Sequence, residues 1–268
     1  MDIRILAALA LIQGLTEFLP VSSSAHLILF PKLTGAADQG VAIDVAVHLG
    51  TLIAVILYFW RDALRMALGG LHLIGGKRTT PEARLAFLLI IATIPVMAFG
   101  ALLKLTGWSD ALRDIRVIGW TMIIFGVALY WADTTRPAER KAVSWSLRDA
   151  VIMGLWQALA LIPGTSRSGA TITAARVLGY ERRDGARLAM LMSIPTIIAS
   201  GVLVGADLDL SERPGILRDM VIGAGLSFVA ALVALVLMMR LLRSVSFTPY
   251  VIYRILLGLI LLWIGAGA

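Results

Sequence analysis

Reactive side chains are concentrated in one stretch of an otherwise apolar part of the sequence, QGLTEFLPVSSSAH, residues 13–26. An amide, a carboxylate, three consecutive hydroxyls and an imidazole occur there, from Gln13, Glu17, Ser22, Ser23, Ser24 and His26. Polar and ionisable groups at membrane depth are costly, so they are candidates for a functional site. The stretch therefore predicts one half of an intramembrane phosphate site.

The types and spacing of these residues indicate acid–base chemistry. Gln13 and Glu17 are four residues apart and share a helix face. Glu17 can take a proton from a hydroxyl or water, or hold a divalent cation that bridges to phosphate. His26 titrates near neutral pH and is the natural proton donor or acceptor; with Ser23 it would form the base and nucleophile of covalent catalysis. The alternative for His26 is a helix cap or a packing residue.

The predicted second half is PGTSRSG, residues 163–169. Its glycines let backbone N–H groups turn toward a ligand, and the helix expected to follow adds a positive dipole end. Arg167 supplies planar, bidentate donors suited to phosphate oxygens. The alternative is that glycine and serine only allow close helix packing in a membrane. That alternative does not explain Arg167 between Ser166 and Ser168, so the stretch predicts an anion cradle.

The composition indicates a polytopic membrane protein. The 268 residues are 59% hydrophobic and only 15% charged, with a mean hydropathy of +0.88, whereas a soluble domain has about 25% charged residues. Cysteine is absent, which excludes disulfides and thiolate chemistry. The net charge of +7 is spread over short turns, which favours the positive-inside rule over a nucleic-acid surface. Residues 1–11 lack a small-x-small cleavage site and are predicted to be retained.

Apolar runs predict an all-α integral membrane protein with six spans. Pro95 interrupts the second and Pro195 the fourth, and a basic connection with glycines in its middle is expected at 61–84. The predicted spans are 41–60, 83–103, 117–131, 188–204, 217–242 and 249–264.

Two charged positions within these spans have two interpretations each. Asp44 and His48, which share a helix face, either support the site or mark an exposed helix start. Arg254 either supports the site or snorkels to the interface.

Two further pairs of apolar segments are too short to span. They flank the polar stretches, at 5–19 with 25–30 and at 150–162 with 170–178. Short apolar pieces joined by a polar, proline-containing turn predict re-entrant helical hairpins, which are tolerated where protein or water surrounds them.

Basic residues predict the orientation. The connections 61–84, 133–148, 176–187 and 240–243 hold 15 of the 24 Lys and Arg residues and all fall on one side if the spans alternate. That side is predicted to be the cytoplasm, with both termini outside. The first hairpin then enters from outside and the second from inside.

The hairpins resemble each other, which predicts an internal repeat. In each, a helix with a glutamine, Gln13 or Gln157, leads to a proline and a hydroxyl-rich run, and an Ile-Pro pair occurs in a later span. Opposite entry makes the repeat inverted, with its site near the bilayer midplane. We expect one membrane domain, 1–268, with a first repeat at 1–132 (re-entrant loop 4–31) and a second at 149–268 (re-entrant loop 150–178).

The two polar motifs closely resemble the signature motifs of the bacterial undecaprenyl-diphosphatase family, the integral-membrane bacitracin-resistance type. The first family motif is Glu/Gln-x-x-x-Glu followed by a proline, a serine-rich run and a histidine. The second is Pro-Gly-x-Ser-Arg-Ser-Gly. DVAVHLGTL (44–52), IPVMAFG and FTPYVIYRI also look like family sequence, so the resemblance covers essentially the whole chain.

The resemblance implies a hydrolase of the bacterial cytoplasmic (inner) membrane. It would convert undecaprenyl diphosphate to the monophosphate carrier lipid of peptidoglycan synthesis, confer bacitracin resistance, and open its site to the periplasm. A divalent cation, Mg²⁺ or Ca²⁺, and a homodimer are also implied. No nucleic acid is expected.

Site residues follow from the same resemblance. Glu17, Ser23, His26 and Arg167 become the catalytic set, with Glu17 also the metal ligand. The substrate-binding residues become Gln13, Ser22, Ser24, Gly164, Thr165, Ser166 and Ser168. Gln13 stands where many members have Glu, which leaves Glu17 and the substrate phosphates to hold the cation.

A different class of function fits the same pattern. An inverted repeat with a midplane anion cradle is also typical of a flippase or transporter of an anionic polyprenyl-phosphate lipid. Glu17 and His26 beside the serines favour hydrolysis, because a pure anion carrier gains nothing from a carboxylate next to a phosphate unless it also binds a cation or couples to protons. The hydrolase hypothesis predicts that His26 and Arg167 lie within reach of one phosphate.

Overall fold

The computed structural model describes residues 1–35, 39–108, 112–205 and 214–267. Six helices in the described ranges are long and apolar enough to cross a membrane, as expected. They are α3 (Val41–Tyr58), α5 (Pro81–Thr106), α7 (Ile115–Thr135), α10 (Arg182–Gly205), α11 (Ile216–Leu241) and α12 (Thr248–Gly267).

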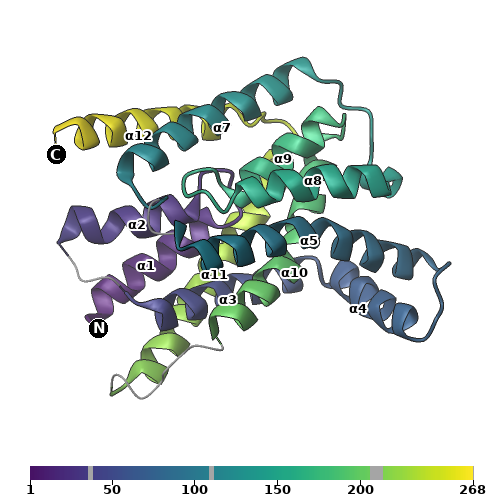
Figure 1. Cartoon of the computed structure of the whole chain (residues 1–268), viewed down its shortest axis with the longest axis horizontal. Helices are drawn as coiled ribbons and strands as arrows, with labels where there is room; N and C mark the ends of the chain where they lie inside the picture. The colour runs from purple at the N-terminus through teal and green to yellow at the C-terminus, as the bar shows by residue number, and fades with distance from the viewer. Residues whose placement is uncertain (36–38, 109–111, 206–213, 268) are drawn as a thin grey trace.

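Two pairs of shorter helices form the predicted hairpins. The first pair is α1 (Ile3–Thr16) and α2 (Ser23–Thr34), and the second is α8 (Leu147–Leu159) and α9 (Arg167–Val177). In Figure 1, α1 and α2 enter from the end that holds both termini, whereas α8 and α9 enter from the opposite end. Their polar turns meet in the middle of the molecule, as the sequence predicts.

The two hairpins share local geometry. Ser22 and Ser166 are the non-glycine residues with positive φ in the described chain, at 71° and 69°, and each immediately precedes a helix. The hydroxyls of Ser22 and Ser24 are 3.2 Å apart, and those of Ser166 and Ser168 are 3.1 Å apart. These matches agree with an internal repeat; its inverted topology stays a prediction.

The packing of the helices also agrees with an internal repeat. Each short first helix packs along a long span of the other half, α1 against α11 and α8 against α5, while α7 packs against α12. The Ile-Pro pairs do not occupy equivalent helices. Pro195 lies on α10, the first helix after the second hairpin, whereas Pro95 lies on α5, the third helix after the first hairpin. The predicted match between these pairs is therefore not part of the repeat.

The predicted interruptions at Pro95 and Pro195 are wrong. Both α5 and α10 continue through their prolines. A proline removes one backbone hydrogen bond and need not end a membrane helix whose neighbours restore the local interactions.

The predicted basic connection at 61–84 contains a helix over its first part, α4 (Trp60–Ile74), which was not predicted from the sequence. It packs against α5. Gly69 permits the close approach, because a Cβ there would come within 2.0 Å of the Glu82 carbonyl oxygen.

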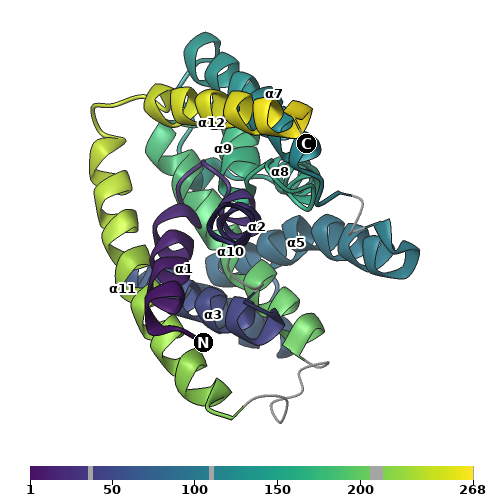
Figure 2. The same cartoon turned by 90° about the vertical axis from the view of Figure 1, so that its left-hand side faces the viewer.

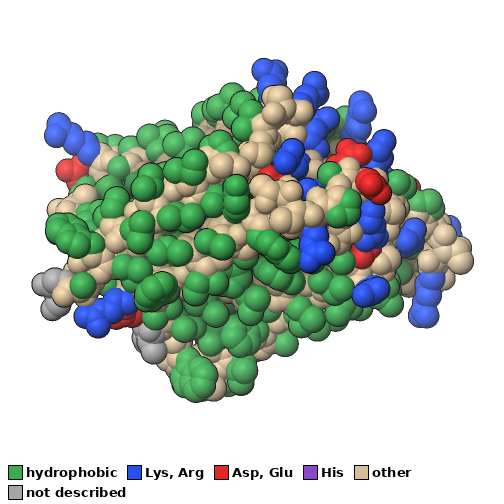
Figure 3. Space-filling view, turned by 90° about the horizontal axis from the view of Figure 1, so that it is seen from above, with side chains coloured by type: hydrophobic (Ala, Val, Ile, Leu, Met, Phe, Trp, Pro, Cys, Tyr) green, Lys and Arg blue, Asp and Glu red, His purple; other side chains and the backbone are tan. Residues whose placement is uncertain are grey.

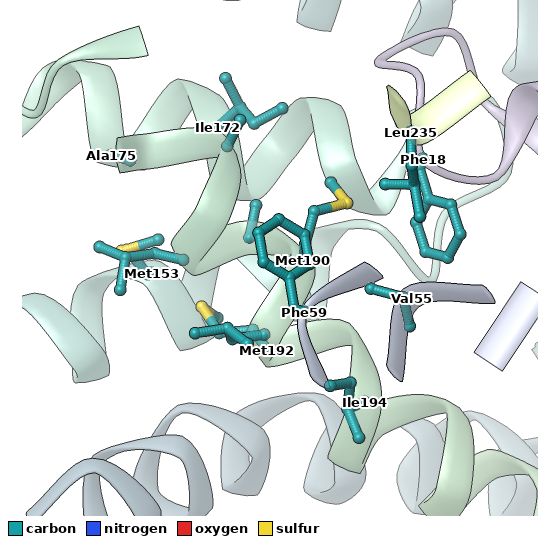
Figure 4. Packing of buried hydrophobic residues seen from close by; sticks show 14 of the residues in the cluster. Phe18, Val55, Phe59, Met153, Ile172, Ala175, Met190, Met192, Ile194 and Leu235 are labelled. Carbon is teal, nitrogen blue, oxygen red and sulfur yellow. The ribbon is translucent and has the colours of Figure 1, made fainter. Parts of the chain in front are cut away.

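The core lies between the hairpin turns and α10. Figure 4 shows Phe18, Met153 and Ile172 of the hairpins around Met190 and Met192 of α10, all at most 1% exposed. Figure 2 places α10 near the centre of the helix assembly. The site therefore sits on a closely packed support.

Basic side chains gather at the end from which α8 and α9 enter, and apolar side chains cover much of the remaining surface in view (Figure 3). Asp133 joins three segments at this end, accepting hydrogen bonds from Arg176, Arg182 and the backbone N–H of Phe247. Both side chains of the Asp133–Arg176 pair are buried. The distribution agrees with the predicted cytoplasmic end.

Candidate active site

Glu17 and Arg167 join the two hairpins. Arg167 Nη2 lies 2.5 Å from Glu17 Oε1, although the residues are 150 positions apart. A second link comes from Ser168, whose hydroxyl donates to the Leu19 carbonyl at 2.9 Å. The predicted meeting of the two polar stretches is present in the fold.

The other carboxylate oxygen of Glu17 gathers the groups of the first hairpin. Ser23 Oγ donates to Glu17 Oε2 at 2.6 Å, and Gln13 Nε2 donates at 2.8 Å. His48 Nε2 lies 3.8 Å from the same oxygen. A buried carboxylate is stable only with such partners, and here they include a hydroxyl placed to lose its proton to Glu17.

A cavity of about 660 Å³ opens onto this cluster. Its polar lining includes Glu17, Ser22, Ser23, Ser24, Ser166, Arg167 and Gln157. Its apolar lining includes Val41, Val45 and Leu49 of α3 and Ile198 and Val202 of α10. A polar end and apolar walls of this size fit an amphiphilic ligand.

The other predicted substrate contacts lie behind the lining. Gln13 binds Glu17, and Ser168 binds the first hairpin. Thr165 is fully buried. Gly164 packs against α7 with φ +90°, and a Cβ there would come within 2.2 Å of Thr121 Oγ1. These residues support the two polar turns. The serines at the starts of α2 and α9, Ser22, Ser23, Ser24 and Ser166, line the cavity itself.

His26 is turned away from the cluster. Its Nδ1 lies 2.7 Å from the Ser22 carbonyl oxygen and its Nε2 lies 2.5 Å from the Tyr253 hydroxyl. The rings of His26 and Tyr253 stack at 5.7 Å. His26 is not among the cavity-lining residues, and the Ser23 hydroxyl donates to Glu17. Ser23 therefore pairs with Glu17 and not with His26 as the sequence predicted. The catalytic role of His26 and its convergence with Arg167 on one phosphate stay predictions.

Asp44 and His48, whose role the sequence left open, both line the cavity. His48 is the histidine that approaches Glu17. Their i, i+4 spacing near the start of α3 already indicated a shared face, but only packing places that face toward the site.

Arg254 supports both polar turns. It is fully buried, which excludes the snorkelling interpretation. Its guanidinium donates to the carbonyls of Pro20 in the first turn and of Gly164 and Thr165 in the second, at 3.4, 3.1 and 2.8 Å. A fourth bond, at 3.2 Å, reaches Met122 of α7. Arg254 is thus a positioning residue behind the cradle.

A family model described as bacitracin resistance protein BacA matches residues 6–260. The chain belongs to this family. Both polar motifs fall within the match, so the resemblance seen in the sequence is confirmed.

Curated relatives match this chain over 97% or more of their length. A relative from Jannaschia sp. is 64% identical over 265 residues, 99% of each chain. One from Ruegeria pomeroyi is 65% identical over 261 residues, 97% of each chain. One from Chromohalobacter salexigens is 46% identical over 266 residues, 99% of this chain and all of the relative. All three carry the name undecaprenyl-diphosphatase.

Among the residues that the structure describes, no cluster of protein ligands marks a site for the expected metal ion. The described residues contain no group of three or more His, Cys, Asp or Glu placed to hold a metal ion. Both Glu17 oxygens already accept hydrogen bonds, one of them from the cation Arg167. The divalent cation therefore stays a prediction.

Proposed function

We infer that this BacA-family chain is an undecaprenyl-diphosphatase, which hydrolyses undecaprenyl diphosphate to undecaprenyl phosphate and phosphate. The observation that carries the inference is the cluster of Arg167, Glu17 and Ser23 at the polar end of an apolar-walled cavity. The name shared by the full-length relatives agrees with it.

Arg167 and the hairpin hydroxyls bind the diphosphate. The substrate's negative charge competes with Glu17 for the guanidinium, and the serines at the starts of α2 and α9 supply further donors. The apolar residues of α3 and α10 receive the polyprenyl chain. Charge that develops on the phosphate oxygens in the transition state is stabilised by donors already in place.

Glu17 acts as the general base for attack on the terminal phosphorus. In the covalent route, Ser23 loses its proton to Glu17 while its oxygen bonds to phosphorus. The anhydride P–O bond breaks, and Glu17 passes the proton to the departing oxygen of undecaprenyl phosphate, which makes Glu17 a base again. Glu17 then takes a proton from water while the water oxygen bonds to phosphorus; the bond between Ser23 and phosphorus breaks, phosphate leaves, and the proton returns from Glu17 to Ser23 Oγ. In the direct route, water takes the place of Ser23. The 2.6 Å Ser23–Glu17 hydrogen bond favours the covalent route.

The site opens to the periplasm in this proposal. The cavity is lined by Val41 at the start of α3 and by Val202 and Val204 near the end of α10. Basic side chains lie at the other end of the molecule (Figure 3). The enzyme thus resides in the bacterial inner membrane, returns carrier lipid for peptidoglycan synthesis and supports bacitracin resistance. The homodimer stays a prediction, which the molar mass of the protein in detergent, measured by light scattering, would test.

Phosphate release tests the function. The purified full chain in detergent should release phosphate from a C15 or C55 polyprenyl diphosphate, and Glu17→Gln or Arg167→Ala should abolish release. A fully active Arg167→Ala protein would contradict the assignment. EDTA should stop the wild-type reaction if the predicted Mg²⁺ or Ca²⁺ is required.

A flippase of an anionic polyprenyl-phosphate lipid is the second candidate, because the polar turns are reached by hairpins from opposite ends (Figure 1). Liposomes separate the two. Movement of a labelled lipid phosphate between leaflets without phosphate release from the diphosphate would favour the flippase.

A further inference from the structure

Gln157 brings an unused hydrogen-bond acceptor to the cavity. It lies on α8, is fully buried and is a cavity-lining residue. Its amide nitrogen donates to the Ala92 carbonyl of α5 at 3.3 Å. Its amide oxygen has no hydrogen-bond partner among the residues that the structure describes. An unpaired buried acceptor costs about 1–3 kcal/mol, so its presence beside a cavity requires an explanation.

The orientation of the amide is determined by its neighbour. The Ala92 carbonyl only accepts hydrogen bonds, so the side that faces it must be the NH₂ group. Exchanging the two ends would put two oxygens together and would not remove the unpaired acceptor.

Three protein donors that line the cavity make hydrogen bonds to other groups, and no donor of the described residues reaches Gln157 Oε1. The Ser23 hydroxyl donates to Glu17 and the Thr196 hydroxyl to the Met192 carbonyl. Arg167 binds Glu17 and the Ser193 carbonyl. A molecule that enters the cavity can supply the missing donor to Gln157 Oε1.

The chemistry of that donor is limited. Ionised phosphate oxygens and the polyprenyl chain offer no donor to an amide oxygen. A hydroxyl does, either on a protonated phosphate or on a water molecule.

We propose that Gln157 is a binding residue of this site whose Oε1 accepts a hydrogen bond from an O–H group at the reacting phosphate. The O–H belongs to the terminal phosphate of the substrate or to the water that hydrolyses it. The proposal rests on the hydrolase function above and adds a residue of the second hairpin to it. Gln13, its counterpart in the first hairpin, does not line the cavity and binds Glu17.

Gln157→Met tests the proposal, since methionine fills similar space without an acceptor. The substitution removes the unpaired acceptor, which stabilises, and also the long hydrogen bond to the Ala92 carbonyl, which destabilises. The Tm in detergent should therefore stay close to that of wild type, while kcat/KM for farnesyl diphosphate falls about tenfold. Leu155→Met, on the lipid-exposed face of the same helix, is the matched control and should keep both quantities.

The two sources of the O–H group separate in the kinetics. A higher KM with unchanged kcat identifies the substrate's own phosphate, and a lower kcat with unchanged KM identifies the attacking water.

Two results would overturn the proposal. One is a Gln157→Met protein within twofold of wild-type kcat/KM. The other is a fall in Tm, or failure to fold, that accounts for the lost activity, because it would assign Gln157 to the Ala92 contact alone. Inactive wild type would instead refute the hydrolase function.

Discussion

Glu17 carries the chemistry of the site at the scale of single residues. Its two oxygens separate two functions: one pairs with the cation that binds phosphate, and the other accepts the Ser23 proton. Loss of Arg167 would leave the Glu17 carboxylate buried without its cation and would destabilise the fold, because both side chains are largely buried.

The Glu17–Arg167 pair predicts a separation of stability from activity. Arg167→Met alone leaves a buried carboxylate unpaired and should lower the free energy of unfolding by about 3–5 kcal/mol. The double variant Glu17→Gln/Arg167→Met should recover most of that loss while remaining inactive. Thermal melts and phosphate release on the same samples measure both. Equal instability of the single and double variants would contradict the prediction.

The contacts of His26 predict that its substitution slows the reaction without changing the pH dependence of the rate. Its two ring nitrogens are engaged by Ser22 and Tyr253, and the Ser22 backbone is held at positive φ. His26→Gln should lower kcat about tenfold by releasing this turn, without changing the shape of the pH–rate profile. Loss of one limb of the profile would instead identify His26 as the proton carrier that the family resemblance implies. Tyr253→Phe is the matched control for the Nε2 contact.

At the scale of elements, the two hairpins depend on α12 for their relative position. Arg254 of α12 holds carbonyls of both turns. A membrane interior supplies no water to replace those bonds.

Arg254→Met should therefore reduce kcat/KM more than tenfold and lower the Tm, since several buried carbonyls lose their donor. Arg254→Lys, with fewer donors and no planar fork, should fall between it and wild type. Arg243→Met, exposed beyond the end of α11, serves as the control and should match wild type. Wild-type activity of Arg254→Met would show that the turns do not need this support.

The start of α8 predicts an acid-dependent stability. Burial raises the pKa of the Asp149 carboxyl, but hydrogen bonds from Arg140, Ser146 and Tyr180 outweigh burial and lower it to about 2. An unfolded aspartate titrates near about 4. The stabilisation is therefore complete above about pH 4 and is lost as the pH falls toward 2.

Melting curves between pH 6 and pH 2 check this prediction. The wild-type Tm should fall most steeply below about pH 4, and Asp149→Asn should have a lower Tm at pH 6 and a smaller fall on acidification. Parallel curves for the two proteins would assign the acid sensitivity to other carboxylates.

At the scale of the whole molecule, the basic end and the cavity mouth determine orientation. Because the chain has no cysteine, single cysteines report sidedness cleanly. Trp108→Cys, beyond α5, should react with a membrane-impermeant maleimide on spheroplasts. Lys77→Cys and Ser244→Cys, at the basic end, should react only after the membrane is opened. The reverse labelling pattern would show that the proposed site opens to the cytoplasm and would contradict the predicted orientation.

The sequence by itself determined the membrane class, the six spans, the two polar hairpins and the pairing of a carboxylate-bearing turn with an arginine-bearing turn. These are local properties: apolar run length sets the spans, and the chemistry of a short motif is readable without its neighbours. The continuation of α5 through Pro95 and of α10 through Pro195 could not be predicted in this way, because it depends on the neighbouring helices.

Only the tertiary structure decided which side chains face the cavity. His48 approaches Glu17 while His26 stacks on Tyr253. Gln157 lines the cavity, and Arg254 lies behind the turns. The physical reason is that the spacing of residues defines a helix face, whereas packing between segments that are distant in the sequence decides what that face contacts.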